Sequence, residues 1–144
     1  MNQENYHKIK QFVHDNYQQI SAKDVLITRI SEQQFQVGDW TVQDMGDKWQ
    51  VSDAAGVCNA TLLQPRLALL TAVLLNRGKR SDATHVNNMD VSYNIFNKDL
   101  SFYLQKTRAD PDNPVYQDRL DNARRSLDLL RDQISEMEKT VKLQ

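Results

Sequence analysis

The 144-residue chain carries 18 Lys and Arg against 19 Asp and Glu, a formal net charge of −1. This balance lacks the strong positive field that dedicated nucleic-acid or membrane-surface binding requires. The single cysteine excludes an intrachain disulfide and a multi-cysteine metal site. Hydrophobic residues make up 40% of the chain and the mean hydropathy is −0.68, which predicts one modest core.

The amino-terminal segment predicts an amphipathic helix over about residues 3–20. Its apolar side chains recur at spacings of three and four: Tyr6, Ile9, Val13, Tyr17 and Ile20. The segment has neither the basic nor the apolar region of a secretory signal. The longest apolar stretch, Leu67 to Leu75, is far shorter than the roughly 20 residues that span a bilayer. We therefore expect a cytoplasmic protein that enters no membrane.

From Val25 the apolar period changes from 3.6 to two, which predicts strands. The segment 25–30 is rich in β-branched residues. Alternating apolar pairs follow it: Phe35 and Val37, Trp40 and Val42, Trp49 and Val51. Turn signals at Gly38-Asp39, Gly46-Asp47 and Ala55-Gly56 separate these pairs. This pattern predicts an antiparallel meander with the two tryptophans on its core face and a last strand at 57–62. A stacking platform for bases or carbohydrate is the alternative role for Trp40 and Trp49.

The segment 65–77 predicts a buried helix, because it is apolar around most of its circumference. Pro65 suits its first turn and Gly78 suits its closing cap. The polar segment 79–88 predicts a turn. Two further helices are predicted, over about 89–108 and from Pro114 to about Lys142, with Asn113 as the cap of the second. The fold class is α+β, divided into a helix–meander–helix domain (1–80) and a long antiparallel helical hairpin (81–144).

The last helix carries a heptad-spaced apolar seam. Its members alternate at spacings of four and three: Tyr116, Leu120, Ala123, Leu127, Leu130, Ile134, Met137 and Val141. Packing on the preceding helix is the main expected use of this seam. The helix predicted from about Met89 is too short to cover Met137 and Val141, so the last two turns are expected to reach outward. The candidate interface residues for self-association or docking are Leu130, Ile134, Met137, Val141 and Leu143.

No set of residues has the spacing of a catalytic, metal or cofactor site. The four glycines fall in turns or at a helix cap, so none remains for a phosphate-binding loop. The one basic cluster, a candidate phosphate contact, consists of Arg66, Arg77, Lys79 and Arg80. The alternative for this cluster is cations that stabilise a helix C-terminus. We therefore expect no enzyme, no cofactor and no metal.

Several short strings of the chain resemble uncharacterised small proteins of marine contractile-tailed phages. They are Trp40-x-Val42-x-Asp44, Lys48-Trp49-x-Val51, the segment 74–79 and the segment 134–138. The resemblance implies a virion or assembly component, or an early accessory protein, in the host cytoplasm or the virion. The expected function is a non-enzymatic structural or interaction protein that uses the helical hairpin as a docking or self-association surface. The alternative is a nucleic-acid or nucleoprotein accessory factor that binds phosphates through the basic cluster.

Overall fold

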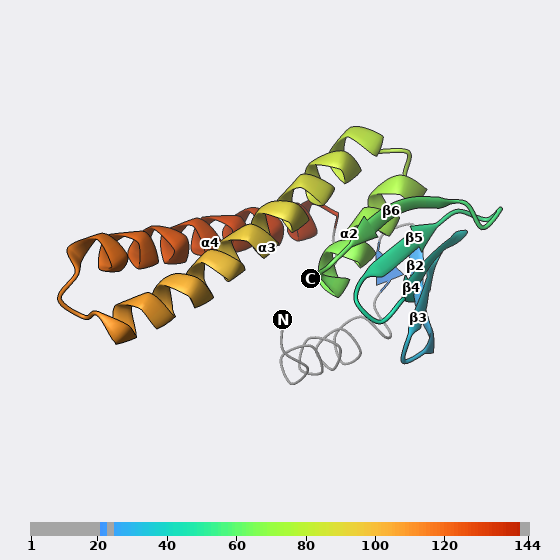
Figure 1. The fold of residues 1–144 in the computed structure, drawn as a ribbon. Coiled ribbons are helices and arrows are strands. Elements are labelled where there is room, and N and C mark those ends of the chain that lie inside the picture. The colour runs from blue at the N-terminus through green and yellow to red at the C-terminus, as the bar shows by residue number, and fades with distance from the viewer. Residues whose placement is uncertain (1–20, 23–24, 142–144) are drawn as a thin grey trace.

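A sheet is followed by three helices in the computed structural model, which describes residues 21–22 and 25–141 (Figure 1). The helix predicted for residues 3–20 lies outside the described residues. The elements are β1 (Ser21–Ala22), β2 (Val25–Ser31), β3 (Gln34–Val37), β4 (Trp40–Asp44), β5 (Trp49–Ser52), β6 (Cys58–Leu62), α2 (Pro65–Asn76), α3 (Arg80–Ala109) and α4 (Pro114–Thr140). The predicted α+β class is confirmed.

The strands pair antiparallel in chain order from β1 to β6, which confirms the predicted meander from Val25 onward, whereas β1 was not predicted. Tight turns set the register, so that Val37 pairs with Trp40 and Asp44 pairs with Trp49. Side chains alternate across the sheet, and one face is buried: Ile27, Phe35, Val37, Val42, Trp49, Val51, Ala60 and Leu62. Trp49 lies in the core, while Trp40 is partly buried against it.

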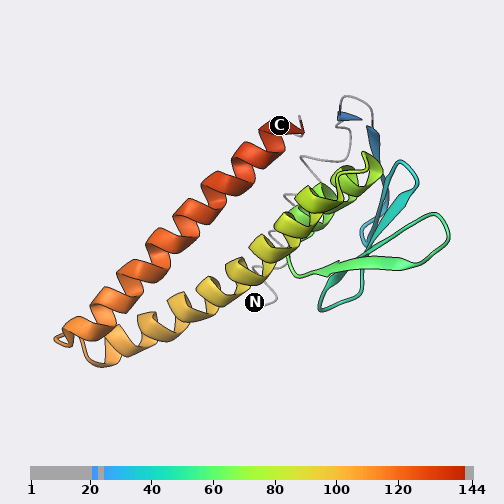
Figure 2. The ribbon, with the colours of Figure 1, turned by 90° about the horizontal axis from the view of Figure 1, so that it is seen from above.

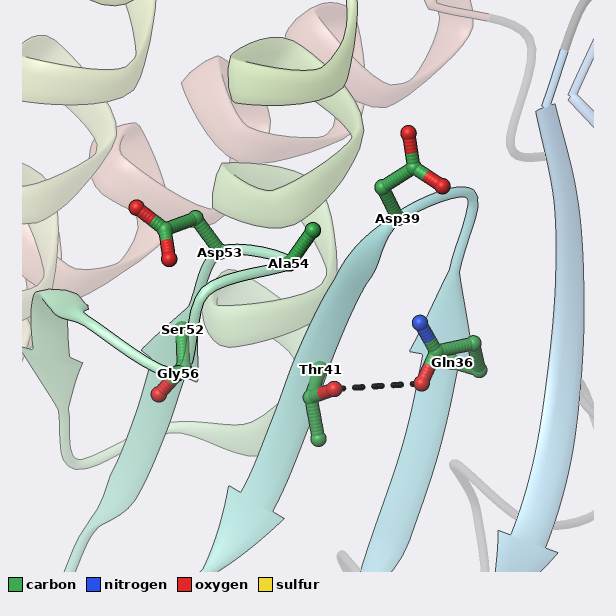
Figure 3. A pocket seen from close by; sticks show the side chains of 7 residues that line it. All are labelled: Gln36, Asp39, Thr41, Ser52, Asp53, Ala54 and Gly56. Carbon is green, nitrogen blue, oxygen red and sulfur yellow. Dashed lines mark hydrogen bonds between the residues drawn. The ribbon is translucent and has the colours of Figure 1, made fainter.

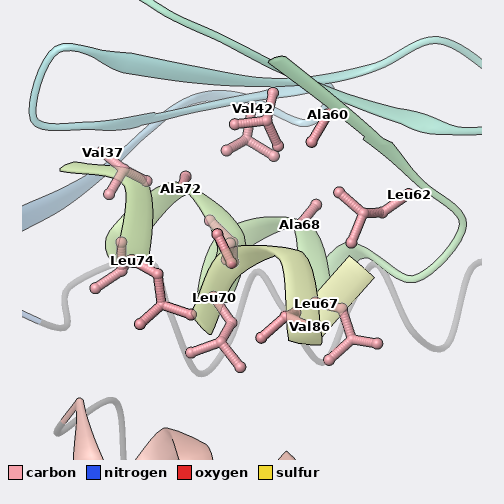
Figure 4. Packing of buried hydrophobic residues seen from close by; sticks show 14 of the residues in the cluster. Val37, Val42, Ala60, Leu62, Leu67, Ala68, Leu70, Ala72, Leu74 and Val86 are labelled. Carbon is pink, nitrogen blue, oxygen red and sulfur yellow. The ribbon is translucent and has the colours of Figure 1, made fainter. Parts of the chain in front are cut away.

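Helix α2 covers the buried face of this sheet (Figure 4). Nine of its 12 residues are buried, and they leave almost no polar side for water. A helix with this pattern must be covered on more than one side. The sheet supplies one cover and α3 supplies another, since α2 contacts β3, β4, β5, β6 and α3.

Helix α2 ends in a backbone motif that depends on Gly78. The Lys79 N–H donates to the Leu74 carbonyl at 2.8 Å, and the Gly78 N–H donates to the Leu75 carbonyl at 3.0 Å. These are the two bonds of a Schellman motif, which requires a left-handed residue after the cap. Gly78 has a φ of 74°. The motif turns the chain directly into α3.

Helix α3 begins at Arg80, so the turn predicted for residues 79–88 is wrong. The segment is polar in composition, but Ala83, Val86 and Met89 recur at a spacing of three and are buried. They join the core that α2 and the sheet form. A helix whose single buried row is widely spaced between polar residues has a weak periodic signal. The core therefore includes residues on both sides of the expected domain boundary at residue 80.

Helix α4 runs back along α3 after a short turn, as two views at right angles show (Figures 1 and 2). The Asn113 side chain accepts the Val115 N–H at 3.0 Å and Pro114 occupies the first turn, as predicted. At 1.5 Å per residue, the 30 residues of α3 span about 45 Å and the 27 of α4 about 41 Å. We call these two helices the arm, and their far half projects away from the sheet.

Replacement of Gly78 by alanine should destabilise the fold by about 1–2 kcal/mol, the cost of a left-handed conformation for an L-residue. No atom lies within 4 Å of an added Cβ, so the loss would report the backbone alone. Urea unfolding followed by circular dichroism measures it. Asn88→Ala, at an exposed site in α3, serves as the control and should cost nothing. Equal stability of Gly78→Ala and wild type would contradict the assignment.

Candidate functional site: the helical arm

The apolar seam of α4 is divided between two partners within the chain. Near the far end, Leu120, Ala123 and Leu127 are buried against α3. Near the sheet, the seam belongs to the main core: Leu130, Ile134 and Val141 are buried in it and Met137 packs against it. The predicted overhang of Met137 and Val141 is wrong, because α3 begins at Arg80 and is longer than α4. Leu143 lies outside the described residues.

The side of α3 that faces α4 is only half buried beyond Asp90. Its aromatic and apolar members share this intermediate exposure: Tyr93, Phe96, Leu100 and Tyr103. The Arg131 guanidinium lies 5.9 Å from the centre of the Tyr93 ring and covers part of it. Two helices alone cannot enclose side chains of this size, so the far half of the arm has a thin core.

A second apolar row lies on the opposite side of α3. Val91, Ile95 and Phe102 are 58%, 50% and 50% exposed, although all three are large and apolar. Their spacings of four and seven place them on one line along the helix. We call them the outer stripe, which spans about 17 Å between its ends. Because two residues advance a helix by about 200°, Ile95 and Phe102 face away from Tyr93 and Leu100.

The outer stripe is flanked by charges of both signs. Lys98 and Asp99 are exposed between Ile95 and Phe102. Beyond them, the Lys106 ammonium lies 5.4 Å from the centre of the Phe102 ring. Sequence inspection missed this stripe, although its signal was present as apolar residues at helical spacing on the second side of α3. The row through Tyr93, Phe96, Leu100 and Tyr103 is denser than the outer stripe.

An ion pair with a buried carboxylate joins α4 to α2. The Glu138 side chain is fully buried and the Arg66 side chain is 31% exposed. The Arg66 Nε donates to Glu138 Oε2 at 2.8 Å, and its Nη2 donates to Oε1. This two-point geometry suits a guanidinium and a carboxylate, and it compensates the cost of burying the Glu138 charge. The last turns of α4 are thereby fixed to the first turn of α2.

A second buried carboxylate, on α3, binds the backbone directly before α2. Asp90 is buried and accepts the N–H of Leu63 at 2.9 Å and the N–H of Gln64 at 3.0 Å. These N–H groups precede α2, whose own cap residue Gln64 makes no side-chain capping bond. Burial raises the pKa of Asp90, while the two backbone hydrogen bonds act in the opposite direction. Both helices of the arm are therefore held at residues 63–66 by a carboxylate.

The structure does not gather the four basic residues into one patch. Arg66 lies in the first turn of α2 and Arg77 follows its last residue, so about 17 Å of helix separates them. The Arg66 guanidinium is bound to Glu138. Lys79 and Arg80 are exposed where α3 begins. Arg66 thus has a structural partner within the chain and lies apart from the other three.

The outer face of the sheet has a shallow polar depression of about 450 Å³ (Figure 3). Gln36, Thr41 and Ser52 supply its floor, and Asp39 and Asp53 stand at one end. The Thr41 hydroxyl donates to Gln36 Oε1 at 3.1 Å. The Asp53 Oδ1 accepts the N–H groups of Ala55 and Val57, each at 3.0 Å. The Asp53 bonds thus stabilise the turn that follows β5, and the Thr41–Gln36 bond joins β3 to β4.

Arg66→Ala would remove the guanidinium from a fully buried carboxylate and is expected to cost about 3–5 kcal/mol of unfolding free energy. The matched control is Lys139→Ala, next to Glu138 in the same helix. Lys139 forms an exposed pair with Glu136, with side chains 62% and 75% exposed, and its loss should cost under about 1 kcal/mol. Chemical denaturation compares the two variants, and similar losses would contradict the role assigned to Glu138.

Asp90→Ala should cost about 2–4 kcal/mol, because two backbone N–H groups at the start of α2 lose their acceptor. The loss should also depend on pH. Since the folded pKa of Asp90 lies above its ordinary 3.8, the folded protein binds this proton more readily than the unfolded chain. The stability that Asp90 contributes therefore grows as pH falls through the raised pKa and levels off below 3.8.

Measuring the unfolding free energy of wild type and Asp90→Ala at about pH 7 and about pH 4 tests the direction of this pH dependence. The difference between the two proteins should be greater at the lower pH. Asp90→Asn, which does not titrate and keeps one acceptor oxygen, is the control for lost hydrogen bonding. A difference that shrinks on acidification would contradict the raised pKa.

Within residues 21–22 and 25–141, no helix is long and apolar enough to cross a bilayer. The same described residues contain no group of three or more His, Cys, Asp or Glu side chains placed to hold a metal ion. Comparison of the chain with protein-family models, with curated proteins and with solved structures gave no match.

Proposed function

We propose that this protein is a non-enzymatic assembly protein that binds a second copy of itself through the outer stripe of its arm. The observation that carries the proposal is the exposure of Val91, Ile95 and Phe102 in one line on α3. Single exposed apolar side chains are common on soluble proteins, but an aligned row of large ones is typical of an interaction surface. The row lies on α3, one of the two helices of the arm.

A second copy is favoured as the partner because the stripe and its flanks complement themselves. A two-fold interface uses the same patch on both partners, so it needs an apolar centre and charges of both signs beside it. The outer stripe supplies the centre, and Lys98 and Asp99 supply the charges. A purely acidic or purely basic flank would repel its own copy.

The dimensions of the stripe predict weak association. A single helix face only about 17 Å long buries less area than the roughly 800 Å² per partner of a standard stable interface. We therefore expect a dissociation constant in the micromolar range. The resemblance to small phage proteins supplies a setting for the proposal, a virion or its assembly. Many copies brought together there would have a high effective concentration, at which a weak contact suffices.

The predicted dimer can be tested with a variant in which all three stripe residues become serine. Wild type should shift from monomer to dimer in sedimentation equilibrium between roughly 5 and 200 μM. The variant Val91→Ser, Ile95→Ser, Phe102→Ser should stay monomeric, because it loses the apolar contact. The fold should survive, since these side chains are at least half exposed.

The matched control is Leu129→Ser, which removes an apolar side chain that is 64% exposed on α4. It should dimerise like wild type. Circular dichroism and thermal unfolding confirm that each variant is folded. The proposal is contradicted if wild type stays monomeric across the concentration range. It is also contradicted if the triple serine variant dimerises like wild type.

A further inference from the structure

We infer that two copies pack with their α3 helices parallel, so that Lys98 of each copy pairs with Asp99 of the other. This inference rests on the proposed self-association and specifies its geometry. Four positions of α3 carry it: Ile95, Lys98, Asp99 and Phe102, at spacings i, i+3, i+4 and i+7. All four are exposed. On a helix these spacings form a diamond on one face.

The two charges lie on opposite sides of the apolar line. From Ile95, three residues turn the helix by about −60° and four residues turn it by about +40°. Lys98 therefore stands on one flank of the line and Asp99 on the other, at nearly the same height. Phe102, two turns after Ile95, returns to the line itself.

A two-fold axis can relate two such faces in two ways. When it runs along the helices, they are parallel, and each flank meets the opposite flank of the partner. Lys98 then lies beside the second copy's Asp99 twice in the interface, with Ile95 against Ile95 and Phe102 against Phe102. When the axis runs across the helices, they are antiparallel, and each flank meets its own copy.

The antiparallel arrangement places like charges together. Lys98 then faces the second copy's Lys98, and Asp99 faces the second copy's Asp99. Like charges that face each other across an interface repel, and opposite charges attract. The apolar line is compatible with both arrangements, so the two Lys98–Asp99 pairs decide between them against the single Lys106, which lies near the line beside Phe102 and faces its own copy in the parallel pair. They favour the parallel pair, in which the two arms project in the same direction.

Charge reversal tests the pairing. Lys98→Glu and Asp99→Lys each replace two attractive pairs of the parallel dimer by two repulsive ones. Each single variant should weaken dimerisation roughly tenfold. The double variant Lys98→Glu, Asp99→Lys restores both attractions with their positions exchanged. Its dissociation constant should return to within about twofold of wild type, as measured by sedimentation equilibrium at low salt.

Crosslinking tests the orientation directly. Cys58 is exposed, so Cys58→Ser provides a background without reactive thiols, and Ile95→Cys is added to it. In the parallel dimer the two introduced thiols meet, and mild oxidation should give a covalent dimer at concentrations where wild type associates. In the antiparallel dimer about 10 Å of helix separates these positions, too far for a disulfide.

The outcomes separate the two proposals. If wild type does not dimerise, the proposed function fails and the geometry fails with it. If wild type dimerises and the triple serine variant does not, the outer stripe is the interface. Single charge variants that then match wild type, a double variant that stays weak, or the absence of the position-95 crosslink overturns the parallel pairing while self-association stands.

Discussion

Helix α2 is the element on which the rest of the structure depends, because it is apolar around nearly its whole circumference. Such a helix cannot lie on a sheet with its other side in water, since several large aliphatic side chains would be exposed. The sheet buries the side that carries Ala68 and Ala72, close to Val42 and Ala60 (Figure 4). The near half of the arm completes the enclosure through Val86, Met89, Leu130, Ile134 and Val141. The arm is therefore a part of the core in one half and a projection in the other.

Two buried carboxylates give this packing a defined orientation. Apolar contacts between helices tolerate small rotations and shifts, because they are not directional. Asp90 and Glu138 instead bind particular donors at residues 63–66 with directional bonds. Each sits on a different helix of the arm, so a shift of either helix would break hydrogen bonds to a buried charge. The angle at which the arm leaves the body is thereby restricted.

The strands and α2 were predictable because their signals are local. Alternation at Phe35, Val37, Trp49 and Val51 identified the buried face of the sheet, and Pro65 and Gly78 marked the ends of α2 within a residue. The beginning of α3 was missed because its buried row consists of Ala83, Val86 and Met89 within a polar segment. That single error led to the predicted overhang of Met137 and Val141.

The hydrogen bonds of Asp90 and Glu138 and the outer stripe were not predicted, for different reasons. The bonds of Asp90 and Glu138 join residues that are 26 or more positions apart, and a single sequence does not reveal such pairs. Glu138 is one of many charged residues in the last helix. The outer stripe was visible at helical spacing, but an apolar side chain on a helix is ordinarily assigned to the core. Only the exposed fractions distinguish the two rows of α3.

The pairing of Arg66 with Glu138 also bears on the order in which the fold can be completed. Their sequence separation is 72 residues, so the contact closes a long loop and its entropic cost is met late. In synthesis from the amino terminus, the sheet and α2 emerge before residues 130–141 are made. Until then one side of α2 lacks part of its apolar cover and Arg66 lacks the Glu138 carboxylate. The nascent chain thus exposes apolar side chains of α2 until the last turns of α4 have been made and can cover them.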